Sequence, residues 1–187
     1  MASTVTTSKL DQLAAGTWNV DVSHSNVSFT ARHLMITKVR GRFTSFTGSV
    51  TIADDKLQSS VTATVDMASV STGDTGRDAH IVGADFFDAE TFPTMTFVST
   101  GIEPAGGDYV LKGDLTIKGV TKPVQFDLEF DGASTDPWGN LKSGFTAETE
   151  INRKDWGLEW NMALETGGVV VSEKIKIQLD IQLAKEA

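Results

Sequence analysis

A strict alternation of apolar and polar residues near the C-terminus constrains the fold of this chain more than any other feature. Between residues 174 and 183, Ile or Leu stands at every odd position and Lys, Gln or Asp at every even one. Side chains of a strand alternate between its two faces, so the pattern places one apolar and one polar face on a single long strand. It therefore predicts a sheet with one buried face.

The same period of two recurs along the chain. It is clear at 27–33, 61–67, 109–117, 124–130 and 145–151, and weaker at 17–23, 39–52 and 94–102. Thr and Val together exceed a fifth of the residues, and β-branched side chains favour strands. Within 39–52 the apolar parity slips between Phe43 and Phe46, which predicts a bulge or a bend there.

Short turns separate these segments and favour antiparallel neighbours. Turn residues occupy 54–56, 105–108, 118–119 and 136–140. Helical signals are sparse: Ser8 could cap a short piece ending before Gly16, and 77–84 and 161–165 could each form a turn or two. We expect an all-β fold, a closed antiparallel barrel of eight strands with one or two short helices, because closure removes exposed sheet edges. A two-sheet sandwich is the alternative. Residues 17–187 would form this single domain, after an N-terminal extension over 1–16.

Composition excludes several classes of function. The net charge is −9, with no dense run of Lys or Arg, so the sequence predicts neither a nucleic-acid partner nor a footprint for an anionic membrane. No segment approaches the ~20 apolar residues of a membrane-spanning helix. The start of the chain lacks the basic and apolar regions of an export signal, which predicts a cytoplasmic location. Without Cys there is no disulfide and no thiolate chemistry.

The inward faces predict either a hollow or a filled barrel. Ala31, Ala63, Gly113 and Ala147 each lie near the middle of an apolar face, beside larger residues. If these four residues lie at the same height along the barrel axis, they form a waist whose short side chains leave room for an apolar ligand. Alternatively, small and large side chains alternate to fill a tapering barrel. The predicted pore-lining residues are Phe29, Ala31, Val61, Ala63, Val65, Leu111, Leu115, Phe126, Leu128, Phe145, Ala147, Ile177 and Leu179.

The sequence contains few signatures of a catalytic site or a metal site. The HExxH and GxSxG signatures are absent. His24 and Ser25 with Asp21, or the run Arg77 to His80, could form part of an acid–base site, or could instead pin strand ends and a loop by hydrogen bonds. The three histidines have no ligand spacing, so the sequence predicts no metal site.

Several spaced motifs resemble those of one known family. They are DVSHS at 21–25, RHLMI at 32–36, VRGRF at 39–43, RDAH at 77–80, DFFD at 85–88, GDLTIKGVTKPV at 113–124, INRKDWGL at 151–158 and WN at 160–161. In this order they resemble the YceI-like, or polyisoprenoid-binding, proteins, and the resemblance covers about residues 17–183.

The resemblance implies an extended lipocalin-like, eight-stranded barrel. Its pore would take a long isoprenoid or a similar amphiphile, with no cofactor. Motif residues that could hold the polar head group, or serve only as structural hydrogen-bonding groups, are His24, Arg42, Arg77, His80, Arg153 and Asn161. A buried polar head needs such partners because an unpaired one costs ~1–3 kcal/mol.

The sequence therefore leaves two candidate functions. The first is non-enzymatic binding, storage or transport of an isoprenoid-type or other long-chain lipid in the barrel pore. The second is an enzyme that acts on a hydrophobic substrate through the His, Arg and Asp cluster. The absence of a recognisable nucleophile favours the first. The oligomeric state, with a homodimer among the options, stays open.

Overall fold

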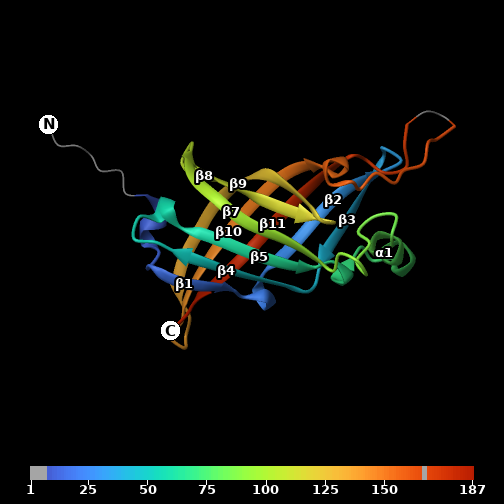
Figure 1. The fold of residues 1–187 in the computed structure, drawn as a ribbon. Coiled ribbons are helices and arrows are strands. Elements are labelled where there is room, and N and C mark those ends of the chain that lie inside the picture. Colours follow the sequence, from blue (N-terminus) through green and yellow to red (C-terminus); the bar gives the residue numbers. More distant parts are fainter. Residues whose placement is uncertain (1–7, 166–167) are drawn as a thin grey trace.

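The computed structural model describes residues 8–165 and 168–187, and in them one antiparallel sheet closes on itself (Figure 1). The strands are β1 (Gly16–Val20), β2 (Asn26–His33), β3 (Thr37–Phe43), β4 (Phe46–Ile52), β5 (Ser60–Asp66), β6 (Val70–Ser71), β7 (Thr94–Ala105), β8 (Asp108–Ile117), β9 (Val120–Thr135), β10 (Leu141–Asn152) and β11 (Lys174–Lys185). Apart from the two-residue β6, each strand overlaps a segment in which the sequence alternates.

Eight of these strands form the closed ring. Their order is β1-β4-β5-β7-β8-β9-β10-β11, and β1 pairs again with β11 through Trp18 opposite Lys185 and Val20 opposite Leu183. The predicted closed antiparallel barrel is thus confirmed in place of the sandwich. Closure gives each of these strands hydrogen-bonding neighbours on both sides.

The remaining strands leave the ring as a ribbon. The second half of β11 pairs with β1, whereas its first half pairs with β2, which continues into β3 and β6. A bend at Thr44 and Ser45 separates β3, in the ribbon, from β4, in the ring. The bend predicted from the parity slip is confirmed, and it lets both Phe43 and Phe46 point inward, where they are 6% and 9% exposed.

Short helices cover the ends of the barrel. The α-helix α1 (Thr75–Val82) starts at Asp74, whose side chain accepts from the Arg77 amide at 2.9 Å. Five 3-10 helices add single turns: η1 (Lys9–Gln12), η2 (Val22–His24), η3 (Lys56–Gln58), η4 (Met67–Ser69) and η5 (Arg153–Trp156). Ser8 caps η1, as the sequence predicts.

The predicted helical turn at 161–165 is wrong. The Asn161 side chain instead clasps the backbone of Val171, donating to its carbonyl at 2.7 Å and accepting from its amide at 3.1 Å. The Val170 amide donates to the carbonyl of Met162 at 3.1 Å. These bonds to residues 170 and 171 occupy groups that would otherwise form hydrogen bonds within a helix, so the segment stays extended.

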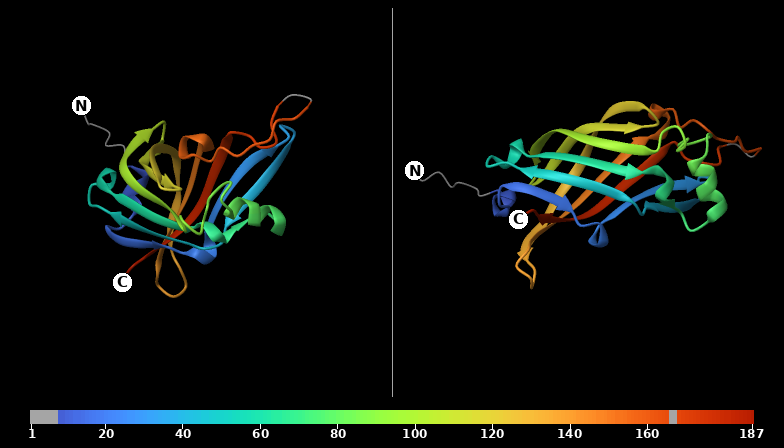
Figure 2. Two further views of the ribbon diagram at one scale, coloured as in Figure 1. Left: turned by 45° about the vertical axis from the view of Figure 1, so that its right-hand side comes forward. Right: turned by 60° about the horizontal axis from the view of Figure 1, so that its bottom comes forward.

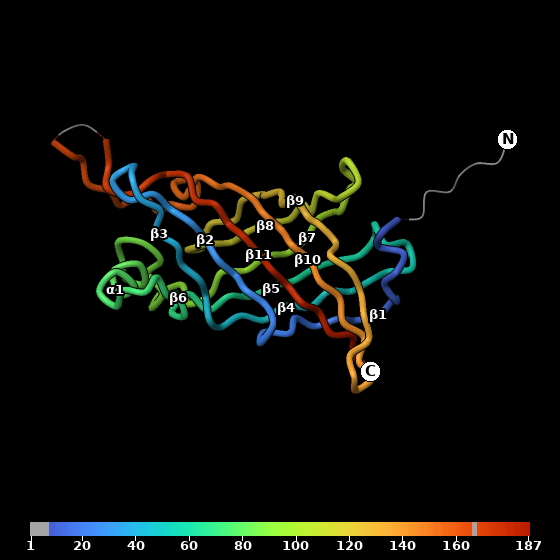
Figure 3. Tube along the Cα trace, turned by 180° about the vertical axis from the view of Figure 1, so that it is seen from behind, coloured from blue at the N-terminus to red at the C-terminus, as the bar shows by residue number. Residues whose placement is uncertain are grey.

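The packed core consists of two clusters near opposite ends of the barrel. One lies towards α1 and includes Met67 and Trp156, and the other includes Leu10, Trp18 and Leu183 beside η1 and the C-terminus. Figures 2 and 3 show α1 and η1 at these opposite ends. The interior between the two clusters is where a ligand could fit.

Gly113 on β8 allows the Phe97 side chain of the neighbouring strand β7 to pack closely against its backbone. A Cβ atom there would collide with the Phe97 ring and would lie 2.7 Å from the carbonyl oxygen of Val98. Gly113→Ala should therefore lower the free energy of unfolding by ~1–3 kcal/mol. Urea unfolding measures this. Gly101→Ala is the matched control, because no atom lies within 4 Å of a Cβ there, and equal losses in both variants would contradict the account.

Candidate functional site

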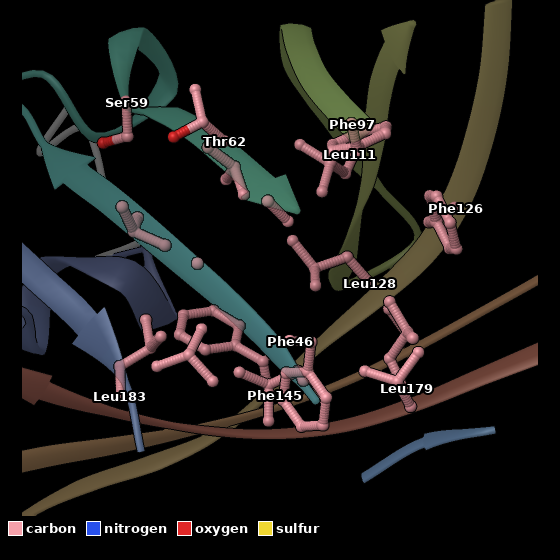
Figure 4. Close-up of a pocket in the computed structure, with 18 of the residues that line it drawn as sticks. Phe46, Ser59, Thr62, Phe97, Leu111, Phe126, Leu128, Phe145, Leu179 and Leu183 are labelled. Atoms are coloured by element: carbon pink, nitrogen blue, oxygen red, sulfur yellow. The ribbon is translucent and has the colours of Figure 1, made fainter. Parts of the chain in front are cut away.

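An apolar cavity of about 190 Å³ lies inside the barrel (Figure 4). All eight ring strands contribute to its wall, together with β2, η1 and the turns that follow η1 and η3. Well-packed interiors contain few voids larger than one water molecule, so a space of this size is a feature of the fold and not a packing defect. The barrel is hollow in its middle.

The alternation of the sequence builds this wall. On β11, Ile177, Leu179, Ile181 and Leu183 face the cavity, whereas the Gln and Asp residues between them alternate to the other face. Ala147 on β10 stands opposite Leu179, so both side chains share the inner face. A period of two along each strand therefore becomes a continuous hydrocarbon surface around the barrel.

Eleven of the thirteen predicted lining residues border the cavity. They are Val61, Ala63, Val65, Leu111, Leu115, Phe126, Leu128, Phe145, Ala147, Ile177 and Leu179. Phe29 and Ala31 do not, because β2 diverges from the ring where they lie. Phe29 instead packs over Gly41 and against Phe43, with 5.7 Å between the two ring centroids. Whether the eleven contact a ligand stays a prediction.

The predicted waist of small residues is only partly present. Ala63 and Ala147 lie on the cavity wall. Ala31 lies outside it, and the ring of Phe97 fills the space above Gly113. Of the four small residues, two therefore line the cavity, one lies outside it and one is covered by an aromatic ring.

Some lining residues were missed by sequence reasoning. Ile181 and Leu183 continue the alternation of β11 and could have been included. Phe46 and Phe97 lie in two of the three weaker strand patterns, 39–52 and 94–102. Leu10, from η1, reaches the cavity only because the N-terminal segment folds across one end of the barrel, and no local pattern indicates that.

The polar part of the wall lies beside η3. Lys56 is the one charged residue that borders the cavity within the described part of the chain, and Ser59 and Thr62 follow it (Figure 4). The Lys56 ammonium donates to the carbonyl of Ala53 at 3.1 Å, and Ser59 Oγ accepts from the Ala53 amide at 3.0 Å. Thr62 is solvent-exposed, so the cavity comes close to the surface here.

None of the six predicted head-group residues borders the cavity. Arg153 is the most buried of them, at 3% exposure, and its guanidinium donates to the carbonyls of Ser172, Leu158 and Val171. Burial lowers the pKa of Arg153, and the nearby Glu173 carboxylate opposes that shift. Through these bonds the Arg153 side chain ties two backbone segments together, at Leu158 and at Val171–Ser172.

The other motif residues near α1 are also engaged locally. His80 Nε2 lies 2.9 Å from a carboxylate oxygen of Asp85, and its ring packs edge-on against Trp160 at 4.6 Å. Arg77 donates to the side chain and the carbonyl of Thr72 at 2.7 and 2.8 Å. Asn161 holds Val171, as described above, and Arg42 is exposed on β3. These contacts fix the loops around α1.

His24 lies outside this group, in a small polar cluster at the junction of β1 and β2. Ser23 Oγ donates to Asp21 at 2.8 Å, and the same hydroxyl and the Asp21 carboxylate both approach His24 Nδ1, at 3.1 and 3.0 Å. A nucleophile triad needs the hydroxyl on one ring nitrogen and the carboxylate on the other. The cluster does not have that arrangement.

Asp21 is held in its ionised form. The hydrogen bond from Ser23 lowers its pKa most, burial opposes this, and His24 and Lys142 lower it further. A carboxyl with a depressed folded-state pKa stabilises the fold above its unfolded pKa, and that contribution is lost as the pH falls.

Asp21→Asn should therefore cost about 1 kcal/mol at neutral pH, because the interaction is partly screened by solvent. The difference in thermal midpoint between the wild type and the variant should shrink as the pH falls below the ordinary carboxyl value of 3.8. Scanning calorimetry from neutral to acidic pH measures it. A difference that stays constant with pH would contradict the assignment.

Within residues 8–165 and 168–187, no three His, Asp or Glu side chains gather in a way that could hold a metal ion. In the same residues, the helices are too short or too polar to cross a bilayer.

Comparison with known proteins gives a consistent family. The model of the YceI-like domain matches residues 18–183. A UPF0312 protein of Staphylococcus aureus (strain MSSA476) is 36% identical over 166 residues, which cover 88% of this chain and 95% of that relative.

Solved structures agree on the fold. BcnA of Burkholderia cenocepacia matches with a TM-score of 0.74 at 29% identity, covering 87% of this chain and 98% of BcnA. A domain from Saccharophagus degradans, described as polyisoprenoid-binding, matches with a TM-score of 0.70 over 90% of this chain and 98% of that domain. Its sequence identity is 17%, so this likeness concerns the fold alone.

Proposed function

The chain belongs to the YceI-like family, and from this premise we propose that it binds an isoprenoid-type lipid or similar amphiphile in the barrel cavity. It would carry or store this molecule without changing it chemically. The observation that carries the proposal is the cavity wall, which is almost wholly aliphatic and aromatic. A domain of the same fold from Saccharophagus degradans is described as polyisoprenoid-binding, and we propose a ligand of the same class for this chain.

The size of the cavity limits how much of the ligand it holds. An engineered apolar cavity of about 150 Å³ accepts benzene, so 190 Å³ takes a chain of about two isoprene units. At ~0.8 kcal/mol per buried carbon, two units contribute ~8 kcal/mol at most. Before the costs of association this corresponds to a Kd of about 1 μM. A longer ligand would extend beyond the cavity or widen it.

We place the polar end of the ligand beside η3. Lys56, Ser59 and Thr62 border the cavity on that side, and a head group there would compete with the Ala53 backbone for the Lys56 ammonium and the Ser59 hydroxyl. The tail needs no directional partner, but a buried head group does. This position replaces the six motif residues as the first candidate for head-group contact.

Binding without catalysis is favoured by the position of the titratable clusters. The Asp21–His24 and His80–Asp85 pairs lie outside the cavity wall. A general acid or base must come within hydrogen-bonding distance of the reacting atom. If the tail of a substrate occupied the cavity, neither the Asp21–His24 pair nor the His80–Asp85 pair would lie within reach of a reacting group.

The experiment is equilibrium uptake of a short-chain prenyl quinone by the purified protein, followed by recovery and mass analysis of the ligand. We expect saturable binding at about one molecule per barrel, with the quinone recovered unchanged. Recovery of a product that grows with time would favour the enzyme, and absence of uptake of prenyl quinones and polyprenyl phosphates alike would contradict binding.

A further inference from the structure

The tip of the β2–β3 hairpin exposes consecutive apolar side chains. Leu34, Met35 and Ile36 are 37%, 54% and 75% exposed. The Leu34 amide donates to Val170 at 2.9 Å, and the Val170 amide donates to Met162, which is itself 58% exposed. Figures 1 and 3 show the tip beside this second segment, at the end of the molecule that carries α1. Contiguous exposed apolar residues mark contact surfaces more often than isolated ones do.

The backbone at this tip is strained. Leu34 and Met35 have φ angles of +53° and +58°, in the left-handed region. Turn residues with positive φ are normally Gly or Asn, because bulky side chains crowd the backbone in that region. Strained positions of this sort gather at functional sites. The tip therefore displays large apolar groups where local structure alone would favour small ones.

The outer face of the same hairpin is cationic. The register places Arg32 opposite Lys38, Thr30 opposite Arg40 and Ser28 opposite Arg42, so these six residues share one face. All four cations are exposed. None of them forms an ion pair with any residue of 8–165 or 168–187.

This charge contrasts with the rest of the chain. Residues 22–53 contain four Lys or Arg and no Asp or Glu, whereas the protein as a whole has 16 cationic and 25 acidic residues and a net charge of −9. The sequence showed no dense cationic run and so predicted no membrane footprint. Pairing of β2 with β3 is what brings the scattered cations onto one face.

We propose that the β2–β3 hairpin docks this protein on an anionic lipid bilayer. Leu34, Met35 and Ile36 enter the acyl boundary, and the cationic row lies against the lipid phosphates. At a rise of roughly 3.3 Å per residue, Lys38 lies ~7 Å and Arg42 ~20 Å along the strand from Ile36. The ribbon must therefore lie obliquely on the surface, so that the whole row stays within reach of the headgroups.

A bilayer fits this surface better than a protein partner does. An apolar tip that enters only a few ångströms, together with a row of like charges, is the pattern of peripheral membrane anchors. Each cation near an anionic leaflet adds affinity independently, without the matched geometry that a protein surface needs. The inference goes beyond lipid binding in the cavity and does not depend on it.

The test is sedimentation of the full chain with vesicles. We expect binding to mixed phosphatidylcholine and phosphatidylglycerol vesicles at low salt, and binding at least about tenfold weaker to phosphatidylcholine alone. Added salt should weaken it, because screening shortens the reach of the charges. Ile36→Asp should reduce binding by about tenfold or more, and Lys38→Gln with Arg40→Gln by about 30-fold.

Trp138→Ser is the matched control. It removes an apolar side chain that is 84% exposed at another hairpin tip, where the Trp138 amide donates to the Asp136 carboxylate, and it should leave binding unchanged. If Ile36→Asp alters the fold, the double variant Lys38→Gln with Arg40→Gln still tests the proposal. Equal binding to both vesicle types, no binding at low salt, or variants that bind like the wild type would overturn the proposal. So would a dimer that Ile36→Asp dissociates in the absence of vesicle binding. Quinone uptake by the same variants should stay normal, which separates this proposal from the cavity function.

Discussion

Ala147→Trp should abolish uptake of an apolar ligand while leaving the barrel folded. Ala147 lies on the cavity wall between Leu128 and Leu179, on the neighbouring strands. An indole there would occupy the space of at least one isoprene unit, whose burial contributes ~4 kcal/mol. The affinity for a short-chain prenyl quinone should therefore fall about a hundredfold or more. Because the ring enters existing space, we expect unfolding free energy to fall by less than about 1 kcal/mol.

Two further variants make the result specific. Ala63→Trp fills the cavity from β5 and should behave alike. Thr64→Trp, one residue along the same strand, is exposed and does not border the cavity, so it should leave uptake unchanged. Losses of ~1–3 kcal/mol or more in both inward variants would instead indicate a filled barrel. Normal uptake by stable inward variants would place the ligand elsewhere.

Arg153→Leu should be the most destabilising single change among the motif residues. The substitution leaves the carbonyls of Ser172, Leu158 and Val171 without their charged donor. The Val171 carbonyl keeps its bond from Asn161, but the Ser172 and Leu158 carbonyls lose a buried partner at ~1–3 kcal/mol each, so we expect a total loss of about 3–5 kcal/mol. For a chain of this size the thermal midpoint should fall by about 6–20 °C.

Arg42→Leu is the control, since Arg42 is exposed on β3. Its thermal midpoint should change little. The outcome that would restore Arg153 as a head-group ligand is a loss of quinone affinity with unchanged stability. Calorimetry and uptake measured on the same preparations separate the two roles.

The parts of this protein that sequence could predict are those governed by local periodicity. The alternation in β11 predicted its strand, its inner face and two of its four lining residues, Ile177 and Leu179, because a strand's face is decided by parity alone. The bend between Phe43 and Phe46 was predictable for the same reason, since only a break in the strand keeps both rings inside.

The parts that could not be predicted depend on how strands meet in space. Phe29 and Ala31 obey the parity rule, yet they miss the cavity because β2 leaves the ring where β11 changes partner from β1 to β2. Gly113 seemed to open the barrel, but Phe97 on the adjacent strand covers it. Asn161 looked like the start of a helix until Val171 took its hydrogen bonds.

The polar residues show the same limit more strongly. Motif membership suggested that Arg153 and His80 face the ligand, whereas their partners are backbone carbonyls and Asp85. Lys56 belongs to none of the motifs and borders the cavity because η3 closes that side of the barrel. A charged residue's role depends on what lies within a few ångströms, and that information is not local in the sequence.

Mass spectrometry of a solvent extract from freshly purified protein tests lipid binding in the cavity most directly. We expect a long apolar molecule at about one per barrel, and its absence from an extract of Ala147→Trp prepared in the same way. A wild-type extract that is reproducibly free of such a molecule, from protein that also takes up no added prenyl quinone or polyprenyl phosphate, would contradict it.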